Sequence, residues 1–154
     1  MALYDTAGQE NLNHLRHLSY PNTNVVLMCF SVDSPASAVN VIDEWSPEIQ
    51  HFCDACPVIL VACKIDLRTD VQTIERLKRT GERPVSTETG RTIAEQIKAD
   101  AYMECSAKTG EGITELFDLA TRLSLEKSSR RRKHSNCALH WLRTLFITSN
   151  SLNR

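Results

Sequence analysis

Three short groups of polar residues each follow an apolar run, and their types suit binding of a charged ligand. They are Asp5-Thr6-Ala7-Gly8-Gln9, Cys63-Lys64-Ile65-Asp66 and Cys105-Ser106-Ala107-Lys108. A carboxylate at the end of a strand can hold Mg²⁺, and a glycine lets a ligand approach the backbone N–H closely. Each group alone is common by chance and equally fits a solvated loop. All three, in order and each after an apolar run, predict one ligand site.

Alternating strand and helix patterns must position these groups. The two longest apolar runs are nearly continuous, which is typical of strands buried on both faces of a parallel sheet. We therefore expect the α/β class, a mainly parallel sheet with helices on both faces, and ligands beyond the carboxyl ends of the strands. The expected strands are residues 2–5, 25–31, 58–63 and 101–105. The expected helices begin after Asp33 or Ser34, restart near Trp45-Ser46-Pro47, and then cover residues 73–80, 87–97 and 113–126.

The three groups together resemble the small GTPases of the Ras superfamily. The resemblance extends through Met28–Pro35, Trp45 and Tyr102–Lys108, which narrows it to the Rho branch. Residues 68–84 form an extra charged helical segment that looks like the insert helix of that branch. The resemblance covers about residues 2–137 and implies a P-loop-NTPase-like G domain over residues 1–126, with a tail over residues 127–154.

The resemblance implies GTP/GDP and Mg²⁺ as cofactors and hydrolysis of GTP as the activity. Asp5 would hold Mg²⁺ through water, where the ion offsets the charge of the phosphates. The backbone N–H of Gly8 would approach the γ-phosphate. Gln9 would be the catalytic residue, because its neutral, two-ended amide suits orienting the attacking water.

The other two groups would bind the base. Asp66 presents two coplanar acceptors, which match the N1–H and N2–H₂ donors of guanine, and adenine lacks that pair. Lys64 can lay its methylene stem along the base, and Lys108 would stack near base and ribose. Ser106 and Ala107 complete the nucleotide-binding group, with the N–H of Ala107 facing guanine O6.

The sequence departs from the family in one large respect. Its five glycines, at positions 8, 81, 90, 110 and 112, form no Gly-x-x-x-x-Gly-Lys-Ser/Thr motif. That P-loop would cradle the phosphates. We therefore expect an incomplete G domain in which the first strand, first helix and second strand are missing, together with the P-loop and switch I. Sheet strands would then be exposed.

Two functions remain open. The first is a Rho-type GTPase, a GTP-dependent switch in signalling, cytoskeletal organisation and cell polarity, although hydrolysis by this chain is doubtful without a P-loop. The second is a truncated fragment without hydrolysis that binds Rho partners through switch II, the family segment that the resemblance places at Asn11–His14 and His17. An unrelated α/β module is a third possibility, and the co-occurrence of three groups argues against it.

Charge is unevenly distributed along the 154 residues. Residues 1–126 carry 11 basic and 19 acidic side chains, and residues 127–154 carry 7 basic and none acidic. The acidic body argues against nucleic-acid binding. The basic run Lys127–Lys133 is expected to meet an anionic membrane surface.

The tail also contains a lipidation candidate. Cys137-Ala138-Leu139-His140 resembles a prenylation box, but such a box is read only at the C-terminus and Trp141–Arg154 follow it. Leu142, Leu145 and Phe146 are spaced for a short interfacial helix on a membrane. A retained intron or a frame error is the other explanation for this extension.

The resemblance further implies partners and a location. Rho effectors, exchange factors, GTPase-activating proteins and a dissociation inhibitor are the expected partners, at the cytoplasmic face of the plasma membrane. The chain itself is expected to be cytosolic or weakly membrane-associated. The six cysteines are expected to be free thiols. Cys53 and Cys56 have the spacing of a zinc or redox pair, but no second pair accompanies them, so a structural role is favoured.

Overall fold

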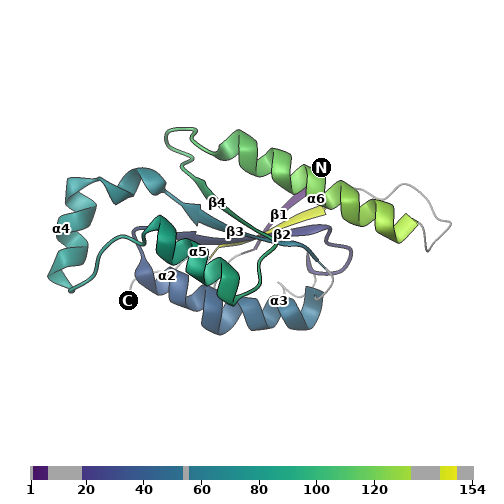
Figure 1. Ribbon diagram of the computed structural model, residues 1–154, viewed down its shortest axis with the longest axis horizontal. Helices are drawn as coiled ribbons and strands as arrows, with labels where there is room; N and C mark the ends of the chain where they lie inside the picture. Colours follow the sequence, from purple (N-terminus) through teal and green to yellow (C-terminus); the bar gives the residue numbers. More distant parts are fainter. Residues whose placement is uncertain (1, 7–18, 54–55, 133–142, 149–154) are drawn as a thin grey trace.

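The computed structural model describes residues 2–6, 19–53, 56–132 and 143–148. Its centre is a sheet of five parallel strands in the order β1-β5-β2-β3-β4 (Figure 1). Four strands confirm the predicted ones, with the α/β class. The strands are β1 (Ala2–Thr6), β2 (Val25–Ser31), β3 (Val58–Cys63), β4 (Ala101–Cys105) and β5 (Arg143–Thr148).

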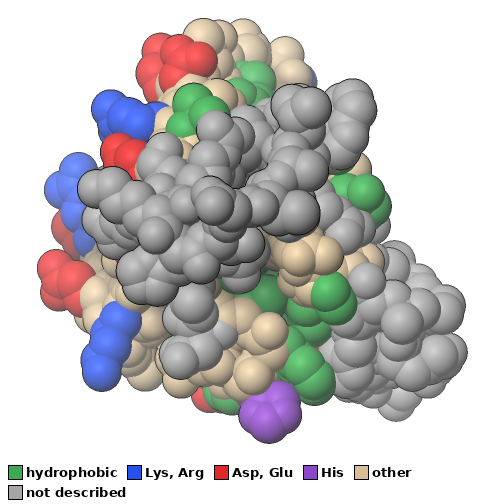
Figure 2. Space-filling model, turned by 90° about the vertical axis from the view of Figure 1, so that its right-hand side faces the viewer, with side chains coloured by type: hydrophobic (Ala, Val, Ile, Leu, Met, Phe, Trp, Pro, Cys, Tyr) green, Lys and Arg blue, Asp and Glu red, His purple; other side chains and the backbone are tan. Residues whose placement is uncertain are grey.

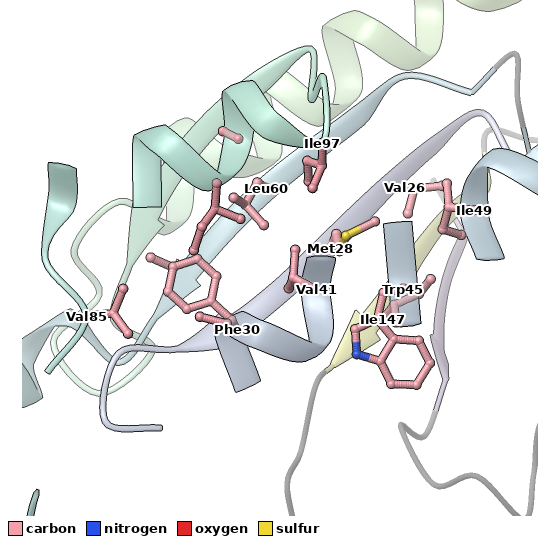
Figure 3. Packing of buried hydrophobic residues seen from close by; sticks show 14 of the residues in the cluster. Val26, Met28, Phe30, Val41, Trp45, Ile49, Leu60, Val85, Ile97 and Ile147 are labelled. Atoms are coloured by element: carbon pink, nitrogen blue, oxygen red, sulfur yellow. The ribbon is translucent and has the colours of Figure 1, made fainter. Parts of the chain in front are cut away.

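Helices cover both faces of this sheet. One face carries α2 (Pro35–Asn40), α3 (Ser46–Cys53) and α5 (Thr87–Gln96), and the other carries α6 (Ile113–Arg132). The larger cluster of buried side chains lies on the first face and includes Phe30, Trp45 and Ile147 (Figure 3). The smaller cluster includes Leu27, Ile59 and Leu116. Adjacent residues of β2 and β3 point to opposite faces, so continuous apolar runs supply both clusters.

The expected restart of the second helical region occurs at Ser46. The π-helical segment η3 (Val41–Trp45) joins α2 to α3, and the Ser46 N–H donates to the Val41 carbonyl five residues earlier. Pro47 has no N–H to donate, and it lies in the first turn of α3, where that loss costs little. The helix therefore passes Pro47 after one widened turn.

Polar side chains begin the two helices after β3. Asp70 caps α4 (Val71–Arg79) by accepting from the Thr73 N–H, and Ser86 caps α5 by accepting from the Thr89 N–H. Both helices match the predicted segments within two residues. The final helix, α6, runs six residues beyond its predicted end at residue 126.

The C-terminal extension corrects two predictions. An interfacial helix is one of the two interpretations that the sequence leaves open for this segment, but Leu145 and Phe146 belong to strand β5, and Leu142 lies outside the described residues. The sequence also predicts exposed sheet strands, but β5 pairs with one side of β1 and one side of β2, and β1 is the outer strand at this end of the sheet. Four of the six residues of β5, Thr144, Phe146, Ile147 and Thr148, are β-branched or aromatic, and such residues favour a strand where two neighbouring strands supply hydrogen-bond partners.

One end of the molecule exposes hydrophobic side chains beside a histidine (Figure 2). His51 meets the ring of Phe52 edge-on at 4.7 Å, and Phe52 stacks on Tyr20 at 5.5 Å between ring centroids. Within the described ranges, no helix combines the length and apolarity needed to cross a bilayer.

Candidate functional site

Strands β2, β3 and β4 end at one edge of the sheet. Ser31, Cys63 and Cys105 are in register across these three strands, so the segments that follow them leave the sheet side by side. Two of the three predicted polar groups follow β3 and β4. The sheet therefore brings Lys64 and Asp66 next to the loop that begins at Ser106, as the sequence predicted.

Asp66 lies at the centre of this arrangement. Its side chain is 14% exposed, and its Oδ1 accepts a hydrogen bond from Ser106 Oγ at 2.5 Å. Lys108 Nζ lies 3.9 Å from Asp66 Oδ2, and the lysine side chain is 80% exposed. Ser106 is fully buried, so its hydroxyl donates to the Asp66 carboxylate from the interior of the protein. The carboxylate is thus fixed in direction, with an exposed cation at its open side.

Lys64 has a left-handed backbone with a φ of 59°. This conformation is uncommon for a residue with a side chain, and it turns the chain sharply from β3 into the 3₁₀ helix η4 (Ile65–Arg68). The Lys64 Nζ lies 3.6 Å from Asp33 Oδ1, so the side chain reaches across to the end of β2.

Asp33 is a site residue that the sequence reasoning missed. It was considered only as a helix cap, but Ser34 occupies the cap position and makes no capping hydrogen bond with its side chain. The Asp33 carboxylate instead accepts the Ser31 hydroxyl and pairs with Lys64 and with Arg76 of α4, whose guanidinium lies at 3.2 Å. Its place directly after β2, at the same edge as Lys64, was the available signal.

The loop from Ser106 to Gly112 is held by its own hydrogen bonds. The Ser106 N–H donates to the Glu111 carbonyl, and Ser106 Oγ accepts from the Thr109 N–H. Gly112 has a φ of +71°, and a Cβ there would lie 2.1 Å from the Glu104 carbonyl oxygen. The loop can close only because this residue is glycine.

The residues predicted for the phosphate side of the site lie at the N-terminal end of the described chain or outside it. Gly8 and Gln9 lie outside the described residues, as does Cys137, while Asp5 is described only as a residue of β1 that pairs with Phe146. Asp33 is neutralised by two cations. No group of three or more His, Cys, Asp or Glu side chains that could hold a metal occurs in the described ranges. Ala107, at the base side of the site, is exposed.

Three thiols lie beneath the base-side loops. Cys29 and Cys105 belong to the smaller buried cluster, Cys63 packs against it, and all five described cysteines are free. The hydrogen bond from the Cys105 thiol lowers the pKa of Cys63. The hydrogen bond with Cys29 and burial raise it by more, so the pKa of Cys63 is raised to about 12. The hydrogen bond with Cys63 and burial raise the pKa of Cys105 as well. Both groups stay protonated at neutral pH and act as packing residues.

A salt bridge connects segment 68–84 to the strand that ends in the site. Arg68 donates two hydrogen bonds of 2.7 Å to the two carboxylate oxygens of Glu104 and a third, of 2.9 Å, to the Val85 carbonyl. Tyr102 and Thr87 also donate to Glu104. The hydrogen bonds from Arg68 make the largest contribution, and those from Tyr102 and Thr87 add to it. Together they outweigh the effect of burial and lower the pKa of Glu104 to about 2.

This salt bridge predicts a pH-dependent contribution to stability. Because the pKa of Glu104 is lower in the folded than in the unfolded chain, the contribution is complete above about pH 5 and declines as the pH falls toward 2. Glu104→Gln is expected to cost about 1–3 kcal/mol of unfolding free energy at pH 7, allowing for partial solvent screening. The measurement is urea unfolding at pH 7, 5 and 3.

The difference between wild type and Glu104→Gln should shrink at each step down in pH. Glu115→Gln is the matched control, because Glu115 is exposed on α6. A difference that stays constant from pH 7 to pH 3 would show that the Glu104 charge contributes nothing.

Comparisons with known proteins agree with this architecture. The family model described as Ras family matches residues 1–126. The chain is 52% identical over 139 residues to the GTP-binding protein RHO1 of Candida albicans, covering 90% of this chain and 70% of that protein. It is 50% identical over 149 residues to RHO1 of Saccharomyces cerevisiae, with 90% and 71% covered, and 49% identical over 146 residues to rho1 of Schizosaccharomyces pombe, with 90% and 72% covered. Together with a parallel sheet whose ends carry Lys64, Asp66 and Ser106, these matches show that the chain belongs to the Ras family, on its Rho branch.

Proposed function

We propose that this chain binds guanine nucleotides in the manner of a Rho-type GTPase, with Asp66 as the residue that selects guanine. The observation that carries the proposal is the fixed Asp66 carboxylate at the carboxyl end of β3, held by Ser106 Oγ at 2.5 Å. Family membership supports it, because the similar fungal proteins are named as GTP-binding proteins.

The chemistry of Asp66 suits this role. A carboxylate accepts hydrogen bonds only, and guanine offers two adjacent donors, N1–H and N2–H₂. Ser106 occupies one lone pair of Oδ1, which leaves acceptor capacity on both oxygens for a base. The Lys108 ammonium lies loosely at Oδ2 and is exposed, so it can move aside to cover base and ribose.

Lys64 would support the base from the other side. Its ammonium pairs with Asp33, and its methylene stem would lie along the base. The base-binding half of the site would thus be formed by the segments that follow β2, β3 and β4, independently of the residues that would meet the phosphates.

The test compares two nucleotides that differ only in the base. We expect GDP to shift the backbone amide resonances of Lys64–Arg68 and Ser106–Thr109, with ADP at least about tenfold weaker, because ADP leaves the Asp66 carboxylate unpaired. The measurement is an NMR titration of the isotopically labelled chain. Equal shifts with both nucleotides would contradict the assignment of Asp66, since the phosphates are the same.

A second candidate is a form without hydrolysis that binds Rho partners through switch II. The absence of a Gly-x-x-x-x-Gly-Lys-Ser/Thr motif from the printed sequence favours it. Effectors, exchange factors, GTPase-activating proteins and a dissociation inhibitor are the partner classes in either case. Binding of Lys127–Lys133 to an anionic membrane and prenylation of Cys137 stay predictions.

A further inference from the structure

Strand β5 lies in the middle of a sheet whose other strands come from the family-matched region. The Ras family match ends at residue 126, and β5 covers Arg143–Thr148. Its two neighbours, β1 and β2, both belong to the matched region. A segment from outside the family domain therefore occupies an interior position of that domain's sheet (Figure 1).

The backbone pairing of β5 is extensive on both sides. Residues 2–6 are in parallel register with residues 143–147, and residues 25–29 are in parallel register with residues 144–148. Among the described strands, β1 pairs with β5 alone. The strand β5 is therefore the element that joins β1 to the rest of the sheet.

Two side chains of β5 are fully buried, and they face opposite sides of the sheet. Ile147 is in register with Met28 and belongs to the larger cluster, which also contains Trp45 (Figure 3). Thr144, three residues earlier, is buried on the other face, which α6 covers. Its hydroxyl finds no hydrogen-bond partner among the described residues. The site between β1 and β2 is thus apolar on the Ile147 side, and on the other side the buried Thr144 hydroxyl is an unfavourable group.

We propose that β1 and β2 form a strand-acceptor site. Its ligand is an extended peptide of six residues, bound in parallel between the two strands and carrying apolar or β-branched side chains at the two buried positions. In this chain the resident ligand is its own segment Arg143–Thr148. Backbone hydrogen bonds supply affinity, and the pockets for Thr144 and Ile147 supply register and selectivity.

The first experiment separates the ligand from its site after folding. A site-specific protease sequence replaces residues 135–140, and the folded chain is cut there, with completeness checked on a denaturing gel. We expect the C-terminal fragment to stay with the body in gel filtration. An excess of a fluorescent synthetic peptide of residues 141–154 should then replace it, while the same peptide with Ile147→Asp should bind at least about tenfold more weakly, because it would bury a charge.

The fragment separating at once, with unchanged amide hydrogen exchange in Val25–Ser31, would overturn the proposal. The same holds if wild-type and Ile147→Asp peptides bind equally. Loss of exchange protection in Val25–Ser31 on separation, restored by added peptide, would support the acceptor site.

The second experiment uses the intact chain, and we expect an increase in its thermal stability. Thr144→Val keeps the shape of the side chain and removes the hydroxyl that has no partner, so the melting temperature should rise by about 2–4 °C. Thr114→Val is the matched control, because Thr114 is exposed on α6, and it should give no rise. An unchanged or lower melting temperature for Thr144→Val would contradict the buried position of β5.

Discussion

Purified residues 1–154 are expected to release no phosphate from GTP above the buffer rate, even with a GTPase-activating protein present. Transition-state charge in phosphoryl transfer is stabilised by a backbone cradle, a lysine and Mg²⁺. The printed sequence contains no motif for the cradle and its lysine. The expected loss is therefore the whole catalytic enhancement, measured as single-turnover phosphate release.

The Gln9→Leu variant distinguishes hydrolysis by this chain from hydrolysis by a contaminant. Phosphate release that is abolished by Gln9→Leu would show that this chain catalyses hydrolysis and that Gln9 orients the water. Release that survives Gln9→Leu would indicate a contaminating enzyme. The first result would exclude the fragment without hydrolysis as the function.

Asp66→Asn is expected to reverse the preference for the base. The asparagine amide presents a donor to the guanine N2–H₂ donor, and affinity for GDP should fall about 10- to 100-fold. Xanthine carries an acceptor at that position, so xanthosine diphosphate should bind the variant better than GDP. The measurement is competition between the two nucleotides for the labelled chain.

The structure allows a clean interpretation of this variant. Asparagine keeps an oxygen that can accept the Ser106 hydroxyl, which bonds to Asp66 at 2.5 Å in the wild type, so the loop should hold its place. Glu111→Gln is the matched control, because it removes one negative charge at an exposed position of the same loop. If Glu111→Gln changes base preference as much as Asp66→Asn, net charge rather than base recognition is responsible.

Strands with continuous apolar runs were predictable from the sequence. Val25–Phe30 and Ile59–Ala62 are buried on both faces, and a short continuous apolar run between helical patterns is typical of a parallel strand inside a sheet. Because parallel strands end at the same edge of a sheet, the loops after them had to share that edge. The amino-acid sequence alone therefore predicts that Lys64, Asp66 and Ser106 lie together.

Asp33 and β5 could not be predicted in the same way, and for different reasons. Asp33 depends on how far the side chains of Lys64 and Arg76 reach, and Arg76 lies 43 positions away on α4. The strand β5 depends on pairing with residues 2–6, at the opposite end of the chain. Its apolar residues fit a helical spacing and a strand spacing equally, and only the space between β1 and β2 decides between them.

Gly112, which closes the loop that begins at Ser106, limits which substitutions this part of the chain can accept during evolution. At Gly112 both the left-handed backbone and the Glu104 carbonyl oxygen exclude any side chain, whereas at Gly81 the backbone alone is demanding and the space around it is open. Asparagine can therefore replace glycine at position 81 at a modest conformational cost, but not at position 112. Insertions and substitutions should accumulate along the exposed turn after α4, while the span from Ser106 to Gly112 keeps its length as long as Asp66 must be held in place.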